Sequence, residues 1–173
     1  MEQVQRNQAD YARFEEALCA VLPVKQIYTE LAVRFAYGTD ASCYRYIPEI
    51  VVRAQNESEV LSIIKIANDQ NIPITFRASG TSLSGQTSSN SVLVLLGDDF
   101  VDTKILDNGA KVKLRPMVIG SNANLALKPF GRKIGPDPAT INTARIGGIA
   151  SNNSSGMCCG TKDNSYHTLD TMR

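Results

Sequence analysis

Two loops poor in side-chain bulk contain the residues most able to bind a ligand. The first loop is RASGTSLSGQTSSN, residues 77–90, and the second loop is GPDPATINTARIGGIASNNSSGMCCG, residues 135–160. Glycines reach φ values that other residues avoid, and small side chains let main-chain N–H groups converge on an anion. Ser and Thr hydroxyls add further donors, so a diphosphate could be held here without lysines. Either loop alone could be a plain turn, but turns seldom need ten or more such residues, so the pair predicts an anion site.

The first loop also tests which phosphate compound could bind. Residues Gly80–Thr87 have the spacing of a P-loop, but Gln86 stands where that motif requires the lysine that reaches the β and γ phosphates. The absence of this lysine argues against a nucleoside triphosphatase. No G-x-G-x-x-G sequence opens a helix, so the usual nicotinamide dinucleotide motif is also missing. The pattern therefore favours a diphosphate of another kind.

Taken together, RASGTSLSG and GPDPATINTARIGGIASNNSSG resemble the FAD-binding domain of the vanillyl-alcohol oxidase / p-cresol methylhydroxylase superfamily. D-lactate dehydrogenases and the glycolate oxidase flavin subunit share this domain. The closing stretch MCCGTKDNSYHTLD resembles FAD-linked D-lactate or D-2-hydroxyglutarate dehydrogenases that carry a C-terminal iron–sulfur domain. The resemblance covers residues 45–173.

This resemblance implies a set of FAD-binding residues, although it gives no catalytic residue and no metal ligand. The first loop would wrap the pyrophosphate with backbone N–H groups, Pro138 would line the flavin, and residues 146–148 would start a short helix facing the cofactor. Residues 153–160 would lie along the ribityl chain and ring. The full set is Arg77, Ala78, Ser79, Gly80, Thr81, Ser82, Leu83, Pro138, Ile146, Gly147, Gly148, Asn153, Ser155, Gly156 and Gly160. Four positions depart from the commonest family pattern: Ala78, Ser79, Ile149 and Ser155.

The resemblance also implies an activity for the whole enzyme. It would oxidise a D-2-hydroxy acid (D-lactate, glycolate or D-2-hydroxyglutarate) by hydride transfer to flavin N5, then pass electrons to a downstream acceptor. An iron–sulfur cluster would lie only in the missing C-terminal part, and residues 1–173 alone would be inactive. Members that bind FAD covalently commonly have a histidine where this chain has Thr81, so we expect noncovalent FAD. The alternatives are another oxidase or reductase of the superfamily, or a nucleotide-binding module without redox activity.

The elements that must position these loops follow from the apolar pattern. Helical spacing predicts helices over residues 8–22 and 25–35, then a helix beginning at Asn56 and another over residues 121–130. Strands are predicted at residues 50–52, 73–76, 92–96, 111–114 and from His167 to Met172. The predicted class is α+β, with a small parallel or mixed sheet, a second sheet and two subdomains. We expect an N-terminal helical arm at residues 1–44 and a FAD-binding domain at residues 45–173, truncated at its C-terminus before the substrate domain.

Composition limits the partners and the compartment. The 18 basic and 17 acidic residues are interspersed, so the basic stripe of a nucleic-acid-binding protein is missing. No apolar run could span a bilayer, and acidic residues near the N-terminus are unlike a signal peptide. We therefore expect a cytoplasmic protein, with peripheral attachment of the full-length enzyme to the inner membrane left open. The four cysteines lack C-x-x-C spacing, which favours reduced thiols over a metal site.

Five side chains in or near the loops could take part in chemistry or in holding the loops. Arg77 could pair with phosphate or hold the loop by hydrogen bonds, and the sequence does not decide between these roles. His167, the single histidine, has no identifiable partner that would make it a general base. Asp137 is interpreted as an acceptor that fixes its loop, and Cys158 and Cys159 as packing residues.

Overall fold

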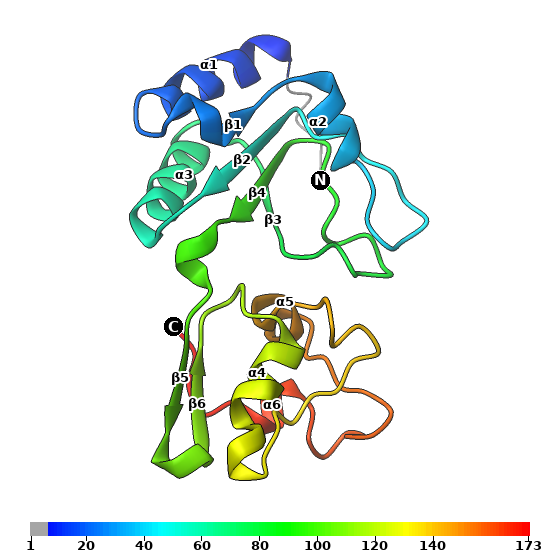
Figure 1. Ribbon diagram of the computed structural model, residues 1–173. Coiled ribbons are helices and arrows are strands. Elements are labelled where there is room, and N and C mark those ends of the chain that lie inside the picture. Colours follow the sequence, from blue (N-terminus) through cyan, green and yellow to red (C-terminus); the bar gives the residue numbers. More distant parts are fainter. Residues whose placement is uncertain (1–6) are drawn as a thin grey trace. The chain divides into compact units, whose positions relative to one another are not determined.

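The computed structural model describes residues 7–173 and divides the chain into two compact units (Figure 1). Unit 1 ends at Gly97 and contains the first loop; unit 2 runs from Asp98 to Arg173 and contains the second loop.

Unit 1 is built on a mixed four-stranded sheet. Its strands are β1 (Ile27–Tyr28), β2 (Ile50–Ala54), β3 (Ile74–Arg77) and β4 (Val92–Leu96), in the order β1-β2-β4-β3. Strands β2 and β3 both run parallel to the central strand β4, and β1 is antiparallel to β2. Strands β2 and β4 have nearly continuous apolar sequences because both of their faces are covered, as is typical of parallel sheets.

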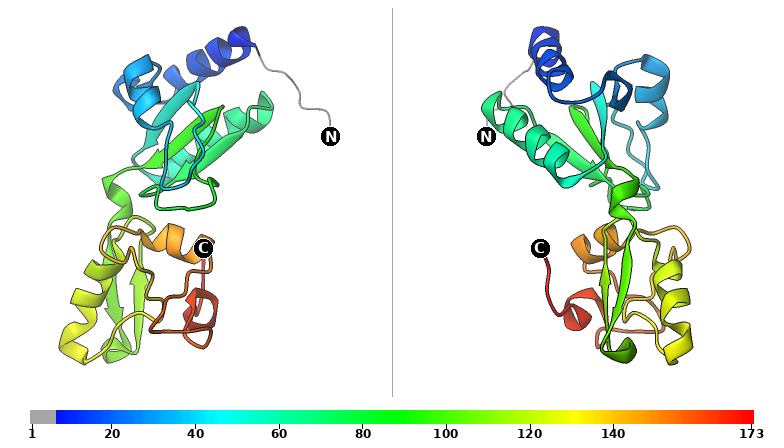
Figure 2. Two further views of the ribbon diagram at one scale, coloured as in Figure 1. Left: turned by 90° about the vertical axis from the view of Figure 1, so that its right-hand side faces the viewer. Right: turned by 60° about the vertical axis from the view of Figure 1, so that its left-hand side comes forward.

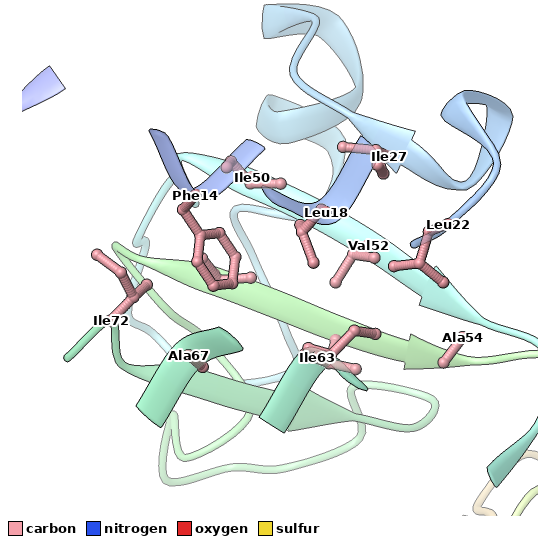
Figure 3. Packing of buried hydrophobic residues seen from close by; sticks show 12 residues of the cluster. Phe14, Leu18, Leu22, Ile27, Ile50, Val52, Ala54, Ile63, Ala67 and Ile72 are labelled. Carbon is pink, nitrogen blue, oxygen red and sulfur yellow. The ribbon is translucent and has the colours of Figure 1, made fainter. Parts of the chain in front are cut away.

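Helices cover both faces of this sheet. Helices α1 (Gln8–Cys19) and α3 (Glu57–Asp69) lie on one face, and α2 (Leu31–Ala36) lies on the other (Figure 2). Phe14 and Leu18 from α1 meet Ile63 from α3 above Val52 in the main core (Figure 3). Asn7 and Asn56 cap α1 and α3, each accepting a hydrogen bond from the third residue of its helix. The α3 cap confirms the helix start predicted at Asn56.

The predicted helix over residues 25–35 is wrong in its first half. Residues Val24–Gln26 form a 3-10 turn, and Ile27 and Tyr28 then pair with Val52 and Val51 of β2. The Gln26 side chain donates to the carbonyl of Arg53 at 2.7 Å and so fixes this turn beside β2. Pairing with the otherwise open edge of β2 outweighs the local helical periodicity, and only Leu31–Ala36 remains helical.

Unit 2 contains the second sheet, an antiparallel hairpin of β5 (Thr103–Leu106) and β6 (Lys111–Leu114). Around it lie α4 (Gly120–Leu127), α5 (Ile146–Ser151) and α6 (Ser165–Thr168), with 3-10 turns at Asp98–Phe100, Asp107–Gly109 and Lys128–Phe130. The helix predicted over residues 121–130 is observed as α4 and the 3-10 turn that follows it, and Gly131 ends this segment in the left-handed conformation. Two α+β units with a mixed sheet and a second sheet confirm the predicted fold class.

The predicted strand from His167 to Met172 is wrong. Asn164 accepts a hydrogen bond from the backbone N–H of His167 and thereby caps the short helix α6, and residues 169–173 have no regular structure. The predicted boundary between an arm at 1–44 and a domain at 45–173 stays a prediction. Within residues 7–173, no helix has both the length and the apolar character needed to cross a membrane.

Candidate cofactor site

The first loop leaves the sheet of unit 1 at the carboxyl edge of the parallel strands. Arg77 is the last residue of β3, and the loop returns to the sheet at the start of β4. Loops at the carboxyl ends of parallel strands are where open α/β sheets usually bind ligands, because neighbouring loops diverge there and leave a crevice. The fold therefore places the predicted residues 77–83 where such a sheet can hold a cofactor.

Arg77 is held by the backbone of a distant segment. Its Nη1 donates to the carbonyl of Tyr37 at 3.0 Å, and its Nη2 donates to the carbonyl of Thr39 at 2.7 Å. The guanidinium also lies 5.7 Å from the centre of the Tyr37 ring. Burial lowers the pKa of Arg77, although the guanidinium stays charged at any physiological pH. Of the two roles that the sequence left open, the structure shows hydrogen bonding to the chain.

The partners of Arg77 belong to a bracing segment, residues 37–46, which is closed by a hydrogen bond from Tyr46 N–H to the Gly38 carbonyl. Ala41 N–H donates to the carbonyl of Gly80 at 2.9 Å, and the Thr87 hydroxyl donates to Asp40 at 2.8 Å. Sequence reasoning missed this segment as part of the site, because its residues have no motif and lie about forty positions away from the loop.

Asp40 is the one acidic residue of the bracing segment, and it contacts Thr87 of the first loop. Burial alone would raise the pKa of Asp40, but hydrogen bonds from Ser42 and Thr87 outweigh it and hold that pKa below its ordinary value. Asp40 therefore stays ionised and keeps accepting these hydrogen bonds. Through the hydrogen bond from Thr87, the Asp40 carboxylate holds the first loop to the bracing segment.

The first loop has an organised interior. The Ser82 hydroxyl donates to the side-chain oxygen of Gln86 and accepts a hydrogen bond from Ser84 N–H. Gly80 has a φ of +67°, a conformation in which an L side chain is strained. Thr81 and Ser82 are half-buried, whereas Leu83 is 78% exposed. Gln86, which occupies the P-loop lysine position, thus supports the loop rather than a triphosphate.

In unit 2, two stretches of the second loop lie against each other. Asp137 N–H donates to the Ser155 carbonyl at 3.2 Å, and the α-carbon of Gly156 faces the Asp137 carbonyl. The structure therefore brings together three predicted residues, Pro138, Ser155 and Gly156. The carboxylate of Asp137 lies 3.5 Å from Lys133, consistent with its interpretation as a residue that fixes the loop.

Residues 146–148 begin a helix, as predicted, and are packed closely on the preceding segment. Ile146 N–H donates to the Val118 carbonyl at 2.9 Å, and Gly147 N–H donates to the Pro116 carbonyl at 2.8 Å. A Cβ on Gly147 would lie 2.9 Å from Pro116, so glycine is required for this approach. Two amides at the start of α5 are thus engaged within the unit, and the orientation of this helix toward FAD stays a prediction.

The remaining predicted residues shape the end of the second loop. Asn153 adopts a φ of +44° and accepts a hydrogen bond from Tyr166 N–H, and Gly160 adopts a φ of +54°. Ser165 donates its hydroxyl to the carbonyls of Ile149 and Ser154, which ties the loop to α6. The loop is therefore ordered by internal hydrogen bonds despite its small side chains.

Neither His167 nor the adjacent cysteines form a reactive pair with a side-chain partner. The ring Nδ1 of His167 lies 2.9 Å from the Thr161 carbonyl, and because a carbonyl only accepts, Nδ1 carries the proton. Cys159 is buried and its thiol faces the carbonyls of Gly156 and Gly160, while Cys158 is exposed. Among residues 7–173, no three His, Cys, Asp or Glu side chains gather so that they could hold a metal ion.

An open hollow of about 370 Å³ on unit 2 is lined by residues of α4 and its C-terminal turn: Ser121, Asn124, Leu125, Lys128, Gly131 and Arg132. It contains none of the predicted site residues, and its walls are mostly exposed. We therefore do not place the cofactor there.

The donors in the two loops suit the diphosphate of FAD in kind. Both loops offer peptide N–H groups and hydroxyls, and glycine at positions 80 and 156 lets the backbone pack where a Cβ would clash with Arg77 and with the Asp137 carbonyl. The loops belong to separate units, so their convergence on one diphosphate stays a prediction.

Comparison with known proteins also points to an FAD-binding domain. The profile of a family described as “FAD binding domain” matches residues 48–173. The chain is 32% identical over 137 residues to D-2-hydroxyglutarate dehydrogenase from Haemophilus influenzae, covering 76% of this chain and 13% of that protein. It is 31% identical over 129 residues to glycolate oxidase subunit GlcD from Bacillus subtilis, covering 73% of this chain and 27% of that protein. The chain thus spans about an eighth and about a quarter of these two relatives.

Solved structures share the fold at lower identity. Alkyldihydroxyacetonephosphate synthase superposes with a TM-score of 0.75 at 17% identity, covering 95% of this chain and 33% of that chain. A p-cresol methylhydroxylase structure with substrate bound superposes with a TM-score of 0.67 at 15% identity, covering 86% of this chain and 30% of that chain. At this identity the likeness concerns the fold alone.

Proposed function

The chain belongs to the family of FAD binding domains, and from this premise we propose that it holds FAD noncovalently within an enzyme that oxidises a D-2-hydroxy acid. The match over residues 48–173 agrees with the resemblance drawn from the two loops and carries the cofactor assignment. The substrate class is supported by relatives named D-2-hydroxyglutarate dehydrogenase and glycolate oxidase, which both take 2-hydroxy acids by name.

The proposed binding residues act mainly through their backbones. Residues Ala78–Leu83 would surround the diphosphate with peptide N–H groups, and the hydroxyls of Thr81 and Ser82 would add donors. The left-handed conformation of Gly80 turns the chain sharply within residues 78–83. These features support a site that recognises an anion by shape and dipoles rather than by lysines.

In the second loop, Pro138, Asn153, Ser155, Gly156 and Gly160 are proposed to line the flavin and ribityl portion, with Ile146, Gly147 and Gly148 nearby. The close contact between Gly156 and Asp137 supports this role, because two backbone stretches pack there with no side chain between them. A thin loop can approach a planar ring closely. When bound, FAD supplies the hydride acceptor for such an oxidation, while the chain supplies position and electrostatics.

We also propose a route for the electrons and a compartment for the full-length enzyme. Electrons would leave to a downstream acceptor, and an iron–sulfur cluster would lie outside residues 1–173. The full-length enzyme would work in the cytoplasm. The closing sequence MCCGTKDNSYHTLD supports the iron–sulfur proposal by its resemblance to fused dehydrogenases.

The decisive experiment is the visible spectrum of the full-length protein under anaerobic conditions. We expect flavin absorbance on purification, and bleaching after addition of D-2-hydroxyglutarate, D-lactate or glycolate. The L enantiomers of the first two acids are the matched controls and should leave the spectrum unchanged. A colourless protein that takes up no added FAD would remove the cofactor assignment. A yellow protein that none of the acids bleaches would remove the substrate class alone.

A further inference from the structure

We propose that Arg77 is a positioning residue that clamps Gly80 against the bracing segment, residues 37–46, and so sets the shape of the first loop. This inference rests on the proposed function, because the loop is taken to bind the FAD diphosphate. It assigns Arg77 a role different from that of a phosphate ligand. It also assigns a role in the site to a segment that precedes the matched domain.

The Arg77 guanidinium points at the backbone of the bracing segment. Nη1 and Nη2 each donate to a main-chain carbonyl, those of Tyr37 and Thr39. Two carbonyls two residues apart match the planar fork of a guanidinium, which a lysine ammonium cannot reproduce. Burial of Arg77 and the nearby ring of Tyr37 keep the guanidinium in this position.

The Arg77 guanidinium also contacts Gly80 directly. A Cβ on residue 80 would lie 2.4 Å from Nη2 and 2.8 Å from Cζ of Arg77. The guanidinium therefore packs directly on the α-carbon of Gly80. The carbonyl of the same glycine accepts the hydrogen bond from Ala41 N–H. Gly80 is thus connected to the bracing segment in two ways. Its α-carbon packs on the Arg77 guanidinium, which binds that segment, and its carbonyl accepts a hydrogen bond from Ala41 directly.

The bracing segment also holds the far end of the loop. Asp40 accepts the hydroxyl of Thr87, and the ring of Tyr44 lies where a Cβ on Gly85 would be 2.6 Å from Cδ2. Thr81–Leu83, which lie between these anchors, are among the residues proposed to surround the diphosphate. Fixing both ends before the ligand arrives reduces the ordering cost of binding.

The test compares R77A, R77K, G80A and the double variant R77A/G80A in the full-length protein. Binding of added FAD is measured by quenching of flavin fluorescence, and hydrogen exchange at Ala41 N–H is measured without FAD. We expect R77A to weaken FAD binding about tenfold and to speed Ala41 exchange about tenfold, with R77K rescuing neither. The diphosphate ³¹P resonances of saturated R77A should also shift, which a loss of global stability alone would not cause.

Gly80→Ala is an independent test, because it keeps Arg77 but disturbs the contact between the guanidinium and residue 80. The Cβ would push against the guanidinium, so G80A should weaken binding in the wild-type background. In the R77A background that clash is gone, and G80A should cost clearly less. R13A is the matched control, since Arg13 is an exposed arginine of unit 1 that pairs with Asp10, and it should change none of these readouts.

Distinct results would overturn the inference or the proposed function. If R77A weakened FAD binding while Ala41 exchange stayed slow and R77K restored binding, Arg77 would be a phosphate ligand. Additive effects of R77A and G80A would likewise overturn the clamp. If the wild-type protein bound no FAD, the proposed function would fail, and the Ala41 exchange data would still decide whether the clamp exists.

Discussion

The α-carbon of Gly156 lies so close to the Asp137 carbonyl that a Cβ on residue 156 would stand 1.8 Å from the oxygen. Real side chains never reach that distance, so the backbone would have to separate. The hydrogen bond from Asp137 N–H to the Ser155 carbonyl would open with it. The contact therefore fixes how close the segment at Asp137 and Pro138 lies to the segment at Ser155 and Gly156.

We predict that Gly156→Ala destabilises unit 2 by about 3 kcal/mol, as expected for a steric clash that only backbone movement can relieve. Urea unfolding followed by circular dichroism would measure this. Gly160→Ala is the matched control, because no atom lies within 4 Å of its Cβ position and only its φ of +54° opposes a side chain. It should cost about 1–2 kcal/mol. Equal costs for the two variants would mean that the Gly156 contact is absent.

Phe14 belongs to the main core of unit 1 although it lies in the predicted N-terminal arm. Its side chain is fully buried with Leu18 and Ile63. Phe14→Ala should therefore lower the free energy of unfolding by about 3–5 kcal/mol, because it leaves a cavity above the sheet. Val24→Ala is the control, since Val24 is 70% exposed and its loss should cost less than about 0.5 kcal/mol. A tolerated Phe14→Ala would show that α1 is a detachable arm.

The local pattern predicted the elements whose cause is local. Asn56 predicted the start of α3 because a cap needs only residues three positions apart. Strand β4 was predicted from Val92–Leu96 because a short apolar run of this kind is buried wherever it lies. The two loops poor in side-chain bulk could also be identified from local sequence, since small residues mark close backbone approach in any fold.

The features that sequence reasoning missed depend on distant contacts. Ile27 and Tyr28 become a strand only because the edge of β2 is available to them, and the hydrogen bond of Arg77 reaches a carbonyl forty positions earlier. The helical turn at Ser165–Thr168 was missed because the apolar and β-branched residues after it suggested a strand. Asn164, a good cap, was the signal that could have identified this turn.

Asp40 gives the site a dependence on pH. Its folded pKa lies below the ordinary value of 3.8, so the ionised form stabilises the fold above that value and the stabilisation is lost as the pH falls through the folded pKa. Asp40→Asn should cost about 1 kcal/mol near neutral pH through weakened hydrogen bonds, and the difference from wild type should shrink below about pH 4. Urea unfolding across this pH range would measure it. Thr87→Val, which removes one donor, should reproduce part of the loss, and a difference that grew in acid would contradict the assignment.

Thr81 lies in the middle of the first loop, where covalent members of the superfamily commonly have a histidine. A threonine hydroxyl cannot form the histidyl bond to the flavin, and the single histidine of the chain, His167, has its Nδ1 engaged by carbonyls of its own unit. We therefore predict that trichloroacetic acid releases all of the FAD from the full-length protein into the supernatant. Absorbance of the supernatant and of the redissolved pellet measures the two fractions, and heat treatment at neutral pH controls for flavin trapped in the precipitate. Yellow colour that stays with the pellet after repeated washing would overturn the prediction, and peptide mapping would then identify the attached residue.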